Sequence, residues 1–157
     1  MKVVVDLGCI PRNGANSLAA LAWEYDPDII YGFDPGDQLV EGTVSRRHLK
    51  IVLRRAAAWT EDGTVKFHED GSGSRVSSEY GVDIPSFDFS HWLRNLKRRT
   101  KADVFVKMDI EGAEYPVLER MVDEGTDRMM SELLVEWHNQ PNGLDERLRC
   151  PVREWWL

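Results

Sequence analysis

The sequence has little cysteine, no long apolar run and no excess of positive charge. Only two cysteines occur among the 157 residues. They are too few for a disulfide framework, so we expect a reducing, cytoplasmic setting. No stretch reaches the roughly 20 apolar residues of a membrane-spanning helix, and we expect no signal peptide before the first strand. The net charge of −7 argues against a nucleic-acid substrate. These absences favour a small soluble enzyme formed by one domain, 1–157, without membrane or nucleic-acid partners.

Two local basic clusters, at 46–50 and 97–101, do not change this interpretation. Each cluster precedes a predicted strand, so it should lie at the N-terminal edge of a parallel sheet, whereas ligands bind beyond the carboxyl ends. We expect both clusters to be solvated helix ends, where cations interact favourably with the helix dipole.

The most informative segment is a strand that ends in charged residues. Residues 104–106 are apolar and favour a strand, and Lys107, Asp109, Glu111 and Gly112 follow. If the two-residue period persists, the lysine and both acids share one face. A strand–helix turn can carry capping acids without any function. Two acids and a lysine exceed what capping needs, and this favours a functional site.

The N-terminal part of the chain has the pattern of a nucleotide-binding half. Residues 2–8 form a β-branched strand that ends in an acid and a glycine. A helix is predicted over 17–25, with Asn16 or Ser17 as its N-cap. The next strand closes with Asp34, which could accept hydrogen bonds from ribose hydroxyls.

The first loop favours S-adenosylmethionine over a dinucleotide. The dinucleotide fingerprint G-x-G-x-x-G is absent, which argues against a nicotinamide dehydrogenase. Asp6 instead precedes Gly8 by two residues. S-adenosylmethionine has no pyrophosphate, but its ammonium and sulfonium groups favour nearby negative charge. The loop alone indicates S-adenosylmethionine only weakly, and Asp34 and Asp109 strengthen that interpretation.

These segments together resemble the FkbM-type S-adenosylmethionine-dependent methyltransferases, mostly O-methyltransferases of sugars and natural products. The resemblance runs from about Val3 to His138, and residues 106–118 are its most specific part, similar to the family segment K-x-D-x-E-G-x-E. It implies a Rossmann-like class I α/β fold, with a mostly parallel sheet and helices on both faces. The supporting segments are 6–8, 33–35, 57–63, 87–88 and 134–138.

The chain departs from the family pattern in three places. Gly14 lies six residues after Gly8 rather than four, and Asp34 stands where the family usually has glutamate. The chain also ends about twenty residues after the predicted fifth strand, so the usual final hairpin should be missing or reduced. A shortened C-terminus leaves an alternative open, a non-catalytic S-adenosylmethionine-binding or assembly protein.

The resemblance implies a role for each matching residue. Asp6, Gly8 and Gly14 would hold the methionine moiety, and Asp34 would bind the ribose. Trp59 either stacks on adenine or is a plain core residue. The complete set of expected cofactor-binding residues is Asp6, Gly8, Cys9, Asn13, Gly14, Asp34, Ala57, Ala58 and Trp59, with Cys9 as a space-filler.

The expected catalytic residues are Lys107, Asp109, Glu111 and His138. His138 is the expected general base for a small-molecule or glycan hydroxyl, because an ordinary histidine pKa near 6.5 suits proton transfer at neutral pH. As an alternative, Asp109 and a neighbour could hold a hard divalent ion such as Mg²⁺. A 2′-O RNA methyltransferase could use similar residues, but the net charge opposes it.

The remaining pattern predicts alternating strands and helices. The tail over 155–157 should fold back on the sheet, or cover an exposed fifth strand in a possible homodimer. We predict strands at 29–35, 51–53, 64–68 and 133–138, helices at 36–44, 89–96 and 117–122, the last ended by Gly125, and a flexible loop at 69–78.

Overall fold

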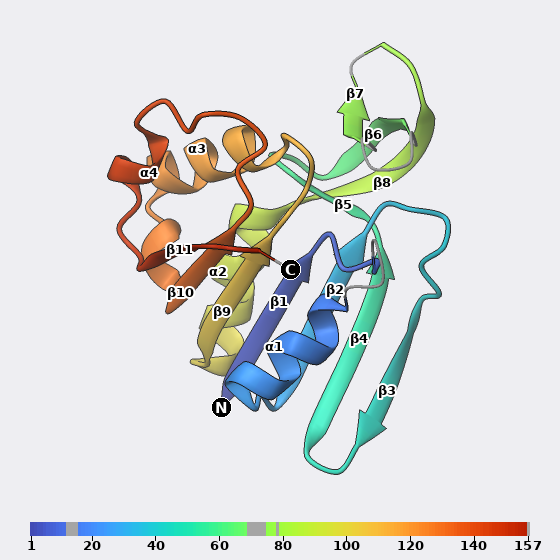
Figure 1. Cartoon of the computed structure of the whole chain (residues 1–157), viewed down its shortest axis with the longest axis vertical. Coiled ribbons are helices and arrows are strands. Elements are labelled where there is room, and N and C mark those ends of the chain that lie inside the picture. Colours follow the sequence, from blue (N-terminus) through green and yellow to red (C-terminus); the bar gives the residue numbers. More distant parts are fainter. Residues whose placement is uncertain (12–15, 69–74, 78, 157) are drawn as a thin grey trace.

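The computed structural model describes residues 1–11, 16–68, 75–77 and 79–156 of the chain. Their backbone forms a mixed α/β fold with a seven-stranded sheet and a separate four-stranded sheet (Figure 1). The predicted cofactor residues Asn13 and Gly14 lie outside the described residues, as does most of the predicted loop at 69–78.

The seven-stranded sheet has the order β11-β10-β9-β1-β2-β4-β3. Among these described strands, β3 pairs antiparallel with β4 and every other neighbouring pair is parallel, so the sheet is mixed. The parallel strands therefore deliver their carboxyl ends to one edge. The strands are β1 (Lys2–Leu7), β2 (Ile29–Asp34), β3 (Gly42–Arg46), β4 (Leu49–Arg55), β9 (Asp103–Met108), β10 (Glu132–Val135) and β11 (Val152–Glu154).

The four-stranded sheet has the order β5-β8-β6-β7. Its members are β5 (Ala57–Trp59), β6 (Gly63–His68), β7 (Arg75–Ser77) and β8 (Val82–Asp88). The predicted strand at 64–68 is confirmed as β6, which pairs antiparallel with both β7 and β8. This small sheet lies beyond the carboxyl ends of the main strands (Figure 1).

Helices cover both faces of the main sheet. Along β1 the side chains alternate: Val4 packs with Leu21 of α1 on one face, and Val5 joins the core on the other. That second face is covered by α2 and α3, whose apolar side chains include Leu93 and Leu118. The helices are α1 (Ser17–Tyr25), α2 (Phe89–Thr100), α3 (Glu114–Glu124) and α4 (Leu144–Arg147), with a 3-10 turn at Asp127–Met129.

The three longer helices confirm the predicted ones, although α2 runs past the predicted end at 96 and α3 begins three residues before the predicted start at 117. The side chain of Asn16 accepts a hydrogen bond from the backbone of Ala19 at the start of α1. Asp88 caps α2 in the same way, and the basic cluster at 97–101 closes that helix as predicted. Gly125 ends α3 in the left-handed conformation that glycine adopts without strain.

The predicted helix at 36–44 is wrong. A turn follows Gly36, and residues from Gly42 onward form β3, whose five residues are all exposed. Glycines disfavour a helix here, and no apolar stripe is available to bury one. The basic cluster at 46–50 is consequently a turn between β3 and β4 rather than a helix end, although it does lie where β4 begins.

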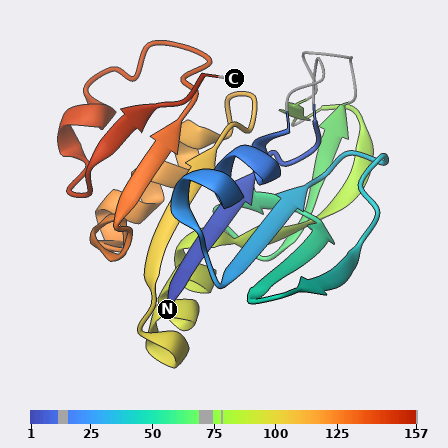
Figure 2. The same cartoon turned by 60° about the horizontal axis from the view of Figure 1, so that its bottom comes forward.

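The C-terminal segment covers the strand that was expected to be exposed. The fifth parallel strand, β10, ends at Val135 rather than His138, and β11 pairs with it in parallel (Figure 2). β11 therefore occupies the strand edge from which a homodimer was predicted, and the homodimer itself stays a prediction. Trp155 is only 6% exposed and packs on the α1 face of the sheet, whereas Trp156 is 72% exposed. None of the described helices is long and apolar enough to cross a membrane.

This packing predicts different effects at the two neighbouring tryptophans. Trp155→Ala should lower the free energy of unfolding by about 3 kcal/mol, because it leaves a cavity in the core. Trp156→Ala should change it by no more than about 0.5 kcal/mol, as at other exposed positions. Urea unfolding of both variants measures the difference. Equal, small effects would contradict the docking of β11 and Trp155 on the sheet.

Candidate functional site

Strand order brings charged residues from distant parts of the chain to one edge of the sheet. β1 lies between β2 and β9, and its Asp6 stands in register with Lys107. β10 lies on the other side of β9, so His138 follows the next carboxyl end. The residues that end β1, β2, β9 and β10 therefore surround one region. This agrees with the general rule that ligands bind beyond the carboxyl ends of parallel strands, called the strand-end rule below.

Lys107 joins the ends of β1 and β9. Its ammonium nitrogen lies 2.7 Å from the carbonyl oxygen of Gly8, 3.2 Å from Oδ1 of Asp6 and 3.3 Å from Oδ2 of Asp109. Burial lowers the pKa of Lys107, but the attraction of Asp6 and Asp109 outweighs it and raises the pKa overall. Lys107 is therefore a buried cation whose partners offset its desolvation.

Asp6 was predicted to hold the cofactor, and in the structure it does not line the pocket. It is fully buried, and its Oδ2 accepts a 2.6 Å hydrogen bond from the hydroxyl of Ser17. Burial raises the pKa of Asp6, and Lys107 opposes that shift. Asp6 stabilises the site from the protein interior, through its ion pair with Lys107 and its hydrogen bond with Ser17.

Gly8 and Cys9 are packing residues of the same loop. Gly8 has φ +80°, and a Cβ there would lie 1.9 Å from the carbonyl oxygen of Asp109. Only glycine permits this close approach of the two strand ends. Cys9 is buried, its sulfur near Gly32, and burial raises the pKa of its thiol. A buried, undissociated thiol suits the space-filling role that was expected of Cys9.

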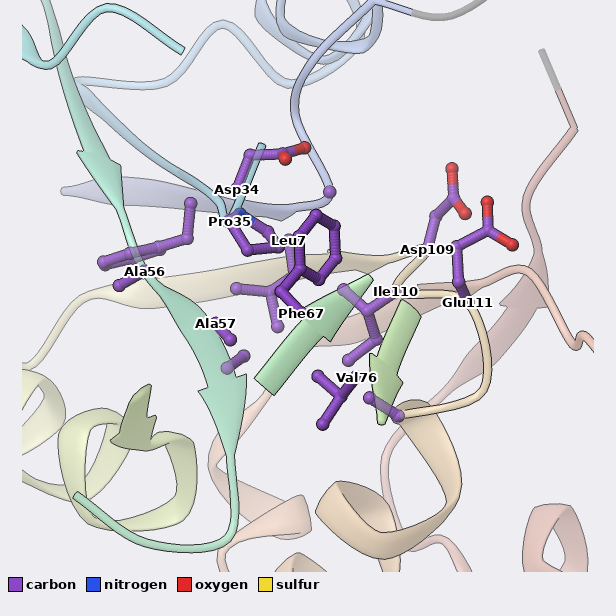
Figure 3. Close-up of a pocket in the computed structure, with 14 residues that line it drawn as sticks. Leu7, Asp34, Pro35, Ala56, Ala57, Phe67, Val76, Asp109, Ile110 and Glu111 are labelled. Carbon is purple, nitrogen blue, oxygen red and sulfur yellow. The ribbon is translucent and has the colours of Figure 1, made fainter. Parts of the chain in front are cut away.

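A narrow pocket opens beside these strand ends (Figure 3). It contains about 430 Å³ of empty space, including the space open to solvent at its mouth, and only a small part of it is wide enough for a water molecule. Six predicted site residues line it: Gly8, Asp34, Ala57, Ala58, Asp109 and Glu111. The other lining residues are Leu7, Phe33, Pro35, Ala56, Phe67, Val76, Ile110 and Ala113.

Asp34 is held firmly at the rim of this pocket. Its Oδ2 accepts a 3.0 Å hydrogen bond from the backbone of Ile10, and its Oδ1 accepts one of 2.9 Å from Gly36. Each carboxylate oxygen can accept a further hydrogen bond, so Asp34 retains capacity for a ligand hydroxyl. Trp59 does not line the pocket, which leaves its predicted stacking on adenine without support.

His138 lies among three acids. Its Nδ1 is 2.9 Å from Oε1 of Glu114, and its Nε2 is 3.2 Å from Oε2 of Glu111 and 3.7 Å from Oδ1 of Asp109. Glu114 is fully buried and also accepts hydrogen bonds from the backbone of Gly112 and His138. Sequence reasoning gave Glu114 no role, although it is the last acid of the K-x-D-x-E-G-x-E segment.

The turn after β9 directs Glu111 toward His138. Glu111 has φ +56° and Gly112 has φ +98°, so two consecutive residues adopt left-handed conformations. That conformation is uncommon for a glutamate and is found mostly where the surrounding structure enforces it. Glu111, Asp109 and His138 each offer a ligand atom, all within 4.8 Å of one another, so together they could hold a cation.

The protonation of His138 differs from the sequence-based expectation. The hydrogen bond to Glu114, helped by the charges of Glu111 and Asp109, raises the pKa of His138 to about 9. A pKa in that range favours the protonated imidazole at pH 7. The argument for a general base with an ordinary pKa near 6.5 does not hold here, because the acids around the ring stabilise its charged form.

The buried position of Lys107 predicts a large loss of stability when its charge is removed. Lys107→Met should lower the free energy of unfolding by about 3–5 kcal/mol, because Asp6 would be left buried without a counter-charge. The matched control is Lys66→Met. Lys66 forms an exposed pair with Asp83 at 3.2 Å, worth at most about 1 kcal/mol. Urea unfolding gives both values, and similar losses would contradict the role of Lys107.

A second variant tests the cause of that loss. Adding Asp6→Asn to Lys107→Met should restore part of the stability, since the uncompensated buried carboxylate is then gone. If the double variant is no more stable than Lys107→Met, lost packing of the lysine stem explains the effect instead.

The environment of His138 predicts a pH dependence. Because its folded pKa is raised, the stabilisation from His138 should be complete below pH 6.5 and lost as the pH rises through about 9. NMR titration of the ring in buffer with a chelator measures the pKa directly. Glu114→Gln should move it down toward 6.5, because the hydrogen bond to Glu114 is the main cause. A midpoint near 6.5 in the unmodified protein would contradict this environment.

Comparison with known protein families gives a match over most of the chain. The sequence model of the Methyltransferase FkbM domain matches residues 36–149, which is more than half of the chain. No curated protein and no solved structure matches. The matched region contains Lys107, Asp109, Glu111 and His138, whereas Asp6, Gly8 and Asp34 precede it. The chain therefore belongs to the FkbM methyltransferase family.

Proposed function

We propose that the chain is an S-adenosylmethionine-dependent O-methyltransferase that acts on a hydroxyl of a sugar or small natural product. The observation that carries this proposal is the distribution of charge around the pocket. Asp34 lies on one side, Asp109 and Glu111 lie on the other, and apolar side chains lie between them (Figure 3). A ligand that fits must combine hydroxyls, an apolar plane and a positive charge.

S-adenosylmethionine has these three properties. Its ribose hydroxyls can donate to Asp34, as ribose does to the acid that ends the second strand of nucleotide-binding folds. The adenine would lie against Phe33, Ala57 and Ala58. The ammonium and sulfonium groups would face Asp109 at the acidic end. This arrangement corresponds to a Rossmann-like methyltransferase, although the sheet is mixed through β3.

The narrowness of the pocket implies some movement when the cofactor enters. Phe67 from β6 and Val76 from β7 form one wall of the pocket, on the small sheet (Figure 3). A shift of these two side chains would widen the space next to Ala57. Such rotamer changes are common on binding and need no change of the main sheet.

The reaction itself is a displacement at the methyl carbon. A lone pair of the acceptor oxygen forms the new carbon–oxygen bond, and the carbon–sulfur bond breaks with its electron pair moving to sulfur, which leaves S-adenosylhomocysteine. The hydroxyl proton must go to a base. His138 can take it only after losing its own proton, so we assign proton acceptance to the coupled group of Asp109, Glu111 and His138.

Binding of the cofactor tests this proposal by calorimetry, in buffer with a chelator. We expect S-adenosylmethionine and S-adenosylhomocysteine to bind with a dissociation constant on the order of micromolar, and NAD not to bind. Asp34→Asn should weaken both adenosyl ligands at least about tenfold, because the ribose loses its carboxylate partner. Asp37→Asn is the matched control, since Asp37 is exposed on the following turn and does not line the pocket.

The outcomes distinguish an error in the proposed function from an error in the proposed position of the ribose. Binding of NAD alone, or of no adenosyl ligand at all, would overturn the methyltransferase function. Tight binding that persists in Asp34→Asn would place the ribose elsewhere. Thermal unfolding of each variant guards against a folding defect, because Asp34 also accepts hydrogen bonds from the backbone of Ile10 and Gly36.

A further inference from the structure

The acids and the histidine at the mouth of the pocket are arranged like the protein ligands of a metal ion. Asp109 and Glu111 follow β9, and His138 follows β10, so two adjacent strands supply the three ligand atoms. These atoms all lie within 4.8 Å of one another. The side chains are partly exposed, at 23%, 17% and 21% respectively, so solvent or a ligand can reach them.

Two of the three ligands are oriented by buried partners. Nδ1 of His138 is 2.9 Å from the fully buried Glu114, which directs Nε2 toward Glu111 and Asp109. Asp109 places Oδ2 3.3 Å from the ammonium of Lys107 and turns Oδ1 toward His138. Metal-binding histidines commonly have such a carboxylate on the other ring nitrogen, where it fixes the tautomer and the ring orientation.

We propose that Asp109, Glu111 and His138 bind one divalent first-row transition-metal ion. One imidazole nitrogen with two carboxylates suits Mn²⁺, Fe²⁺, Co²⁺ or Zn²⁺ better than Mg²⁺, which prefers oxygen ligands throughout. The sequence suggested a hard ion such as Mg²⁺ held by Asp109 and an unspecified neighbour, and the structure supplies a ligand set that includes the imidazole of His138. Three protein ligands also leave positions on the ion for water or substrate, as in catalytic metal sites.

The use of the ion rests on the proposed function. Asp109 and Glu111 belong both to the ligand set and to the acidic side of the pocket. An ion held there could bind the acceptor hydroxyl and lower its pKa, which eases its deprotonation at neutral pH. With the ion bound, these three side chains coordinate it, so the released proton would pass to solvent and not to them. The acceptor would then be a compound that presents an oxygen ligand to the metal. The binding of the ion itself does not depend on methyl transfer.

The test is a titration of the full chain with Mn²⁺ alone, after metal has been removed with a chelator and the chelator has been removed in turn. Electron paramagnetic resonance of free Mn²⁺ counts the sites without any cofactor present. We expect one site, with Mg²⁺ competing at least about tenfold more weakly because of the nitrogen ligand. Pulsed measurements should show a coupled imidazole nitrogen, which an oxygen-only site would lack.

Three variants assign the site. His138→Ala should abolish the nitrogen coupling and weaken Mn²⁺ at least about tenfold. Glu114→Gln should weaken Mn²⁺ about 10–100-fold while keeping the nitrogen coupling, because Glu114 acts through the orientation of His138. His48→Ala is the matched control and should change neither, since His48 pairs with Asp26 at 2.9 Å on an exposed surface.

The outcomes that overturn the proposal are distinct from those that overturn the proposed function. Absence of a Mn²⁺ site, equal binding of Mg²⁺, or Mn²⁺ binding that survives His138→Ala would each contradict this ligand set. His138 would then be a protonated partner of the surrounding acids. Because calorimetry with S-adenosylmethionine is carried out in chelator, a failure of either experiment leaves the other result standing.

Discussion

The buried ammonium of Lys107 is the interaction on which the geometry of the site depends. An isolated lysine in such a position would lose its proton, because desolvation disfavours the charged form. Here Asp6, Asp109 and the carbonyl oxygen of Gly8 surround the ammonium, and its pKa is raised instead. The partners come from both β1 and β9, so one cation fixes the spacing of two strand ends. Asp109 can therefore occupy the rim of the pocket in a defined orientation.

The elements predicted from sequence were those whose residues carry a strong local signal. β1 and β9 have β-branched apolar runs, α1 and α2 have capping side chains, and α3 ends at a glycine. β3 carries no such signal, because all its residues are exposed and its pairing with β4 alone defines it. β11 is three residues long and pairs in parallel with β10. Long-range pairing of this kind leaves no periodic pattern in so short a segment.

Within the site, the strand-end rule predicted where the side chains lie better than it predicted what surrounds them. It placed Asp34, Asp109 and Glu111 around one opening, and the structure brings them to one pocket. It did not distinguish Asp6, which points into the interior, because burial depends on what packs beneath the strand. The protonation state of His138 could not be predicted from the sequence either. Its pKa depends mainly on Glu114, and nothing local in the sequence indicates that the first residue of α3 faces the end of β10.

The charge of the whole cluster limits which ligands the site can accept. Its carboxylates outnumber its cations, and Asp6 and Asp109 are held in place by the buried ammonium of Lys107. A pyrophosphate or another phosphate would meet this negative field at close range, and like charges at an interface cost several kcal/mol. A sulfonium, an ammonium or a divalent ion would instead be attracted, so the electrostatics oppose a dinucleotide independently of the missing glycine fingerprint. The acids are Asp6, Asp109, Glu111 and Glu114, and the cations are Lys107 and His138.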